Sequence, residues 1–118
     1  MELPINPADY PAEIARLRLK VLDTEQHIRA VNASIADCTL AIEVAVATDK
    51  GLTNETLRKT RKQELIANDA DLMEASQVLQ SLKDEMARTE IQIELLRNEQ
   101  INLRIAKEHQ IALMTSTK

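Results

Sequence analysis

Residues 48–63 read TDKGLTNETLRKTRKQ, and this stretch decides how the chain is organised. Gly51 is the only glycine, and Pro4, Pro7 and Pro11 all lie near the N-terminus. A helix arriving from the N-terminal side is expected to end at Gly51, because glycine readily adopts the left-handed conformation that closes many helices. A second helix is expected directly afterwards, with Thr53 as N-cap and Leu52 and Leu57 spaced as a hydrophobic staple. A stop and a start this close together predict a helical hairpin.

The composition favours long helices over a thick globular core. Of the 118 residues 44% are hydrophobic and 29% are charged, whereas Phe and Trp are absent and Tyr10 is the single aromatic residue. This balance is typical of coiled coils and long helices. No run approaches 18 uninterrupted apolar residues, and the N-terminus lacks the features of a signal peptide. We therefore expect a soluble cytoplasmic protein that does not enter a membrane.

Apolar residues recur every seven positions on both sides of the turn. Before it, the a and d positions are Ile14, Leu17, Val21, Thr24, Ile28, Val31, Ile35, Cys38, Ile42 and Ala45. After it, they are Leu65, Asn68, Leu72, Ala75, Leu79, Leu82, Met86, Thr89, Ile93, Leu96 and Leu103. Such seams are typical of helices that pack along one another. Residues 39–48 are β-branched enough for a strand, but their apolar positions keep the helical period, so a helix is favoured there.

The predicted fold is all-α: a single-domain, two-helix antiparallel coiled-coil hairpin whose second helix is the longer. Its segments are a proline-containing arm at 1–10, a helix at about 11–49, a turn at 50–53, a helix at about 54–114 and a disordered tail at 115–118. Folding back about Gly51 places Pro11 beside Ile91. The residues after Ile91 are therefore expected to have no partner within their own chain.

This unpaired end is strongly apolar. Its large aliphatic residues are Ile91, Ile93, Leu95, Leu96, Ile101, Leu103 and Ile105. They point around nearly the whole circumference of the helix, and a helix that is apolar on all sides must be buried on all sides. A second copy is the simplest cover, so we expect a homodimer, or a higher even oligomer, that forms a helical bundle. Two alternatives stay open: the last 20 residues fray, or the N-terminal arm alone covers them.

Polar residues interrupt the two seams at several positions. Thr24, Asn68 and Thr89 occupy d positions, and Gln100 and Lys107 occupy a positions. Buried polar residues at such positions can fix the register and the number of helices at some cost in stability. The alternative is that these side chains loosen the packing or face solvent.

No group of residues indicates catalysis, a metal or a cofactor. One glycine cannot build a glycine-rich phosphate loop, and no cluster of Cys or His could hold zinc. Cys38 lies on an apolar seam, where a cysteine is usually part of the core. His27 follows Asp23 by one turn, the spacing of an ordinary surface pair. We expect a protein that is not an enzyme and needs no cofactor.

Charge is concentrated just after the turn. The chain has a formal net charge of -4, yet residues 50–62 contain five bases and one acid, Glu55. The bases are Lys50, Arg58, Lys59, Arg61 and Lys62. This tip can be a solvated patch, a docking surface for an acidic protein partner, or a phosphate-binding surface for nucleic acid. The acidic chain and the lack of flanking aromatic residues disfavour nucleic acid. The predicted function is a self-associating scaffold or adaptor, with a nucleic-acid-binding accessory protein as the alternative.

Overall fold

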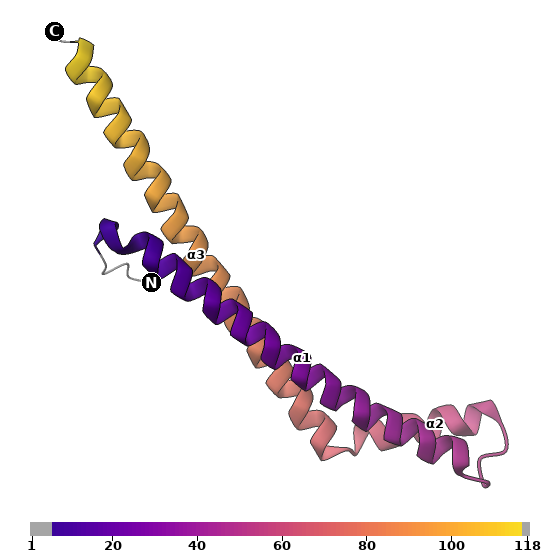
Figure 1. Ribbon diagram of the computed structural model, residues 1–118. Coiled ribbons are helices and arrows are strands. Elements are labelled where there is room, and N and C mark those ends of the chain that lie inside the picture. The colour runs from indigo at the N-terminus through magenta and orange to yellow at the C-terminus, as the bar shows by residue number, and fades with distance from the viewer. Residues whose placement is uncertain (1–5, 117–118) are drawn as a thin grey trace. The chain divides into compact units, whose positions relative to one another are not determined.

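The computed structural model describes residues 6–116, and every regular element in that range is a helix (Figure 1). A short 3-10 helix, η1 at Pro7–Asp9, precedes α1 at Tyr10–Thr48. Helix α2 at Glu55–Ala67 and helix α3 at Ala70–Ser116 follow. The all-α class is confirmed, and residues 39–48 are helical as expected. The second half of the described chain, however, holds two helices where one was predicted.

Asn68 and Asp69 separate α2 from α3. Asn68 closes α2 with φ -101° and ψ 2°, and its backbone N–H donates to the carbonyl oxygens of Glu64 and Ile66. The Asp69 carboxylate then accepts a hydrogen bond of 3.0 Å from the Leu72 N–H, as the N-cap of a new helix does. The predicted continuous helix over 54–114 is therefore wrong. Asn and Asp side chains compete for backbone hydrogen bonds, so they end and restart a helix without glycine or proline.

The turn between α1 and α2 is built around Asp49. Its Oδ1 accepts a hydrogen bond of 2.8 Å from the Gly51 N–H, and its carbonyl oxygen accepts one of 3.2 Å from the Leu52 N–H. No described residue has a positive φ, so the left-handed conformation predicted for Gly51 is wrong. A Cβ on Gly51 would lie 3.2 Å from Asp49 Oδ1. The small size of glycine therefore suits this turn.

The helix starts differ slightly from the prediction. Asn54, one residue after the expected Thr53, is the N-cap of α2, and its side chain accepts a 2.9 Å hydrogen bond from the Leu57 N–H. At the N-terminus, the Asn6 side chain accepts a hydrogen bond from the Ala8 N–H and caps η1. Residues 1–5 of the predicted arm and 117–118 of the predicted tail lie outside the described residues.

The C-terminal boundary also differs from the prediction. Thr115 and Ser116 belong to α3, although a disordered tail was expected from residue 115. Their hydroxyls donate to the carbonyl oxygens of Ile111 and Leu113, respectively, each at 3.0 Å. These bonds satisfy two carbonyl groups in the last turns of the helix, where regular partners run out.

The chain divides into two compact units. Unit 1 comprises Met1–Asp23 with Glu85–Lys118, and unit 2 comprises Thr24–Asp84. The core of unit 1 is a cluster of Tyr10, Ile14, Leu17 and Leu96, with Ile93 packed against it. The core of unit 2 is a cluster of Ile42, Val46 and Leu72, with Ile35, Cys38, Leu52 and Leu65 packed against it. The single domain expected from the sequence stays a prediction.

The predicted seams are covered along most of α1 and α3. Every seam position from Ile14 to Ile42 and from Leu72 to Leu96 is buried or half-buried. Two apolar seam positions of these helices are exposed: Ala45, where the adjacent Val46 takes the buried position instead, and Leu103, which lies beyond the covered part of α3. The stripe of core-facing side chains is therefore the feature that the sequence predicts best.

Two of the polar seam residues are buried. Thr24 is 5% exposed and Thr89 is 3% exposed, and the Thr89 hydroxyl donates to the Glu85 carbonyl oxygen at 3.0 Å. The solvent-facing alternative is therefore wrong for these two threonines, whereas their effect on register stays a prediction. Asn68 is exposed at the break between helices, Gln100 is half-buried and Lys107 is exposed.

Candidate functional site

The predicted basic tip lies in unit 2, with Lys50 in the turn and its other four residues on α2. Two of the five form ion pairs. Arg61 Nη1 is 3.2 Å from Glu64 Oε2, and Lys62 Nζ is 3.0 Å from Glu43 Oε1 on α1. Among residues 6–116, no ion pair holds Lys50, Arg58 or Lys59. Two cations on the first turns of α2, Arg58 and Lys59, therefore form no ion pair with a carboxylate of the described residues.

These cations line a groove between the end of α1 and the start of α2, which we name the basic groove. Its volume is about 370 Å³. It is lined by Glu43, Val46 and Ala47 of α1 and by Glu55, Arg58, Lys59 and Lys62 of α2. Val46 is 7% exposed and contributes a buried apolar wall, whereas the charged groups stand where solvent reaches them. The groove thus combines an apolar surface with a cationic rim.

The residues predicted as an oligomer interface fall into two groups. Leu96 is 2% exposed in the core of unit 1, and Ile93 packs against that core. The expectation that no residue after Ile91 has a partner in its own chain is therefore wrong for these two. The first turns of α1, which begins at Tyr10, cover them. The other five are exposed: Ile91 at 53%, Leu95 at 40%, Ile101 at 44%, Leu103 at 43% and Ile105 at 54%.

Residues 101–116, which we name the α3 end, are exposed without exception. Within unit 1, Figure 1 shows this yellow part of α3 extending past the start of α1 with no other described segment beside it. Three further large apolar residues on it were not singled out from the sequence: Ile111, Leu113 and Met114, which are 54%, 53% and 63% exposed. The same lack of a polar face that marked Ile101 to Ile105 could have identified them.

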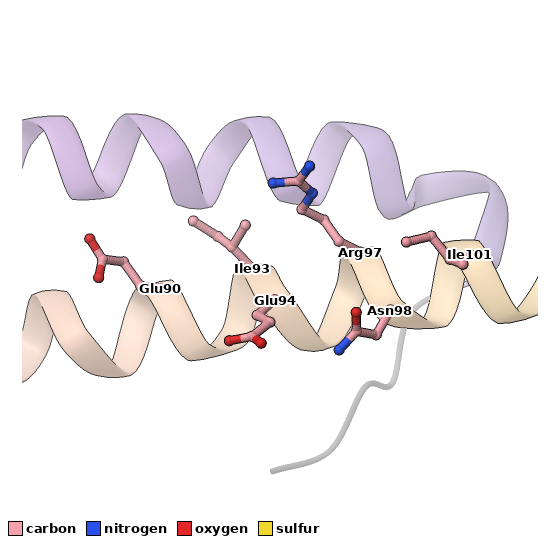
Figure 2. A pocket seen from close by; sticks show the side chains of 6 residues that line it. All are labelled: Glu90, Ile93, Glu94, Arg97, Asn98 and Ile101. Atoms are coloured by element: carbon pink, nitrogen blue, oxygen red, sulfur yellow. The ribbon is translucent and has the colours of Figure 1, made fainter.

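A second groove, of about 320 Å³, lies where the covered part of α3 passes into the α3 end. It is lined by Glu90, Ile93, Glu94, Arg97, Asn98 and Ile101. Figure 2 shows Ile93, Arg97 and Ile101 directed toward α1, while Glu94 and Asn98 point away from it. Apolar and charged side chains of both signs therefore stand together at the start of the uncovered segment.

Residues with catalytic or metal-binding chemistry are scattered. Within the described part of the chain, no group of three or more His, Cys, Asp or Glu side chains could hold a metal ion. Cys38 is half-buried against the core of unit 2, which confirms the prediction that it belongs to the core. The half-buried Glu13 carboxylate has a lowered pKa, chiefly because it accepts hydrogen bonds from the Arg16 guanidinium. The same bonds raise the pKa of Arg16.

One helical stretch is long and apolar enough to cross a membrane, judged by length and composition. It lies within Pro7–Thr48, where an 18-residue window has a mean hydropathy of 1.5 and is 11% buried. The prediction of no membrane span rests on the lack of an uninterrupted apolar run. Residues 30–47 are apolar on average, although the charged residues Asp37 and Glu43 interrupt them.

The chain matches no family model, no curated protein and no solved structure. Two surfaces, the basic groove and the α3 end, are therefore the candidate sites that its own residues provide. Their residues belong to different units, so each surface can be altered by substitutions of its own.

Proposed function

We propose that the protein is a non-enzymatic cytoplasmic adaptor, an antiparallel coiled-coil hairpin that pairs with a second copy and docks a protein partner at its basic tip. The observation that supports this most is the exposure of large aliphatic side chains along the whole α3 end. A single helix of this length is marginal in water, and most helices in proteins are stabilised by packing. A second copy supplies apolar surface of the same kind. In a two-fold symmetric interface, the same surface patch of each copy packs against the other.

The packing of unit 1 supports the antiparallel arrangement. Lys20 Nζ lies 3.7 Å from Glu85 Oε1. Earlier on α1, Tyr10 packs in the same cluster as Leu96, which comes later on α3. Residue numbers therefore fall along α1 while they rise along α3, as they do in a helical hairpin.

Charge favours a second copy that runs in the opposite direction. Residues 85–100 of α3 contain four acids and two bases, whereas the α3 end contains Arg104 and Lys107 against Glu108. Two copies that cross near residue 100 in opposite directions place the basic segment of each against the acidic segment of the other. Such complementarity sets the orientation and speeds association. Most of the affinity then comes from apolar burial, at about 25 cal/mol per Å².

Sedimentation velocity tests the pairing. The variant Ile101→Asp with Ile105→Asp alters two exposed side chains, so we expect it to remain folded and to become a monomer. Burying two carboxylates in an apolar contact should weaken association by at least about 100-fold. The matched control is Leu19→Asp with Leu22→Asp, which changes two exposed leucines on α1 of the same unit and should leave the dimer intact. A monomeric wild type at 100 µM, or a dimer that survives the first variant, would refute the pairing.

The alternative function is a nucleic-acid-binding accessory protein that contacts phosphates with the basic tip. It is favoured by Arg58 and Lys59, which no ion pair holds among the described residues. Binding of this kind falls steeply with salt. A gel shift with a duplex and a single strand should then be present at 50 mM salt and lost at 200 mM. The absence of any shift at 50 mM removes this alternative.

A further inference from the structure

We propose that the basic groove binds an acidic peptide segment of the partner protein and that one aliphatic side chain of this segment enters the groove between α1 and α2. The inference rests on the proposed adaptor function and specifies the chemistry of the partner. It is carried by the shape of the groove, its apolar wall and the two cations that have no carboxylate.

The apolar part of the groove suits one aliphatic side chain. Val46 forms a buried wall, and Ala47 is too small to fill the space beside it. The volume of about 370 Å³ is at the lower end of the range for binding pockets, enough for a Leu or Ile side chain with its adjoining backbone. Leu40, which is 58% exposed, precedes Ala47 by two helical turns on the same side of α1. The peptide can therefore continue along an apolar surface.

The rim of the groove is selective for carboxylates. Lys62 is already held by Glu43 at 3.0 Å, an exposed pair that fixes its ammonium group against α1. Arg58 and Lys59 are adjacent on α2 and form no ion pair with a carboxylate of the described residues. An Arg guanidinium can bind a carboxylate through two parallel hydrogen bonds, and a Lys ammonium adds a second charge-assisted bond. Acidic residues on either side of an aliphatic residue match this arrangement.

Nucleic acid and lipid fit the same groove less well. Its charged lining residues are three bases and two acids, a net charge of +1, which is small for binding a nucleic-acid backbone. Two available cations are also few compared with the roughly 6–10 phosphate contacts of a typical DNA-binding protein. The only aromatic residue, Tyr10, is buried in unit 1, so no ring can stack on a base. A lipid surface is flat, whereas the apolar and cationic groups here converge on a groove.

Fluorescence polarisation with a labelled acidic peptide tests the charge requirement. The probe is a fluorescein-labelled nonapeptide of Glu and Asp with one central Leu, at 50 mM salt. We expect Arg58→Glu with Lys59→Glu to weaken binding by at least about tenfold, since it replaces attraction by repulsion. The matched control is Lys83→Glu with Arg88→Glu, which makes the same change of net charge at two exposed residues that do not line the groove. It should bind the probe within about twofold of wild type.

A second pair of measurements tests the aliphatic side chain. Replacing the central Leu of the probe by Ser should weaken binding to the wild type by about fivefold, because less apolar surface is buried. Ala47→Phe fills the groove without changing its charge and should abolish the difference between the Leu and Ser probes. Ala33→Phe, at another exposed alanine of α1, should preserve it. Circular dichroism confirms that each variant is folded before binding is compared.

Each result has one interpretation. Equal binding of the probe by wild type and by Arg58→Glu with Lys59→Glu overturns the proposal, as does equal binding of the Leu and Ser probes. Binding of oligothymidylate or of phosphatidylserine vesicles, without binding of the peptide, overturns it in favour of nucleic acid or lipid. Sedimentation velocity on the same samples distinguishes failure of peptide binding at the groove from failure of self-association. A dimer that does not bind the peptide refutes the groove alone, and a monomer that binds it refutes the self-association alone.

Discussion

Leu96 and Leu103 lie seven residues apart on α3 and occupy the same position of the heptad, yet their surroundings differ completely. Leu96 is 2% exposed within the core of unit 1, whereas Leu103 is 43% exposed. The residue type, the helix and the periodic position are identical. The difference is the reach of α1, whose first residue, Tyr10, packs in the cluster around Leu96. A heptad pattern therefore identifies which side of a helix is apolar, but the length of the neighbouring helix decides where that side is covered.

This difference separates two tasks within one helix. The covered part of α3 stabilises unit 1 because it removes apolar surface from water. The α3 end contributes little to the stability of a single chain, and its aliphatic side chains stay available for assembly. Substitutions in the two parts should therefore change different measured quantities.

The largest expected difference is between Leu96→Ala and Leu103→Ala. Truncating a buried leucine costs about 2–5 kcal/mol of unfolding free energy, because burial is lost and a cavity is left. Truncating the exposed Leu103 should cost less than about 1 kcal/mol in the monomer. Urea unfolding at a concentration where the protein is monomeric measures both values. Similar losses for the two variants would show that the α3 end is packed within its own chain.

Amide hydrogen exchange sharpens the same comparison. In the monomer, residues 101–116 should exchange much faster than residues 85–96, because no packing opposes the opening of the uncovered turns. When the protein concentration is raised above the dissociation constant, exchange in 101–116 should slow by at least about tenfold. Exchange in 85–96 should change far less. Slow exchange in 101–116 at every concentration would contradict an unpaired segment in the monomer.

A smaller effect is expected at the break between α2 and α3. Asp69→Ala removes the side chain that accepts the Leu72 N–H, and loss of an N-cap costs about 1 kcal/mol. Asp71, an exposed acid in the first turn of α3, provides a matched control. Asp71→Ala should cost less because only its interaction with the helix dipole is lost. Neither variant should alter self-association, because unit 2 contains both residues. A dimer weakened by Asp69→Ala would contradict this separation.

The sequence predicted the apolar side of each helix correctly and predicted the helix ends less well. Hydrophobic periodicity is repeated over many residues, so single exceptions such as Ala45 do not obscure it. Helix ends depend on one or two side-chain hydrogen bonds. Asn54 and Asp69 both act as N-caps, and both residue types are strong candidates for that position. The break between α2 and α3 contains neither Gly nor Pro, and it depends on the hydrogen bonds of Asn68 and Asp69 alone.

The candidate surfaces were predictable in composition but not in detail. The five bases of the tip were evident from the sequence. The pairing of Lys62 with Glu43 depends on where α2 lies beside α1. The covering of Leu96 likewise depends on the register of α1 against α3. A register shift of a few residues moves a whole turn of side chains, and local sequence does not specify such a shift.

The smallest expected effect concerns Glu13 and Arg16, which lie beside the covered part of unit 1. Arg16 Nε donates to Glu13 Oε2 at 2.9 Å, and a second N–H of the guanidinium donates to Oε1. Because these bonds lower the pKa of Glu13 in the folded state, their contribution is present above the ordinary glutamate pKa and is lost as pH falls through the folded value. Arg16 is exposed and solvent also reaches the half-buried Glu13, so the change in stability should be slight.

NMR titration of the Glu13 carboxyl carbon measures this effect directly. Arg16→Gln should raise the pKa of Glu13 back toward its ordinary value, because the hydrogen bonds and the positive charge are both removed. Arg18→Gln is the control, since Arg18 is an exposed neighbour that forms no hydrogen bond to Glu13 in the structure. An unchanged Glu13 pKa in Arg16→Gln would contradict the pair. If the pair is present, its loss should slightly destabilise the part of unit 1 around Leu96 at neutral pH. Self-association through the α3 end should stay unchanged, because the covered part of α3 governs stability and the α3 end governs assembly.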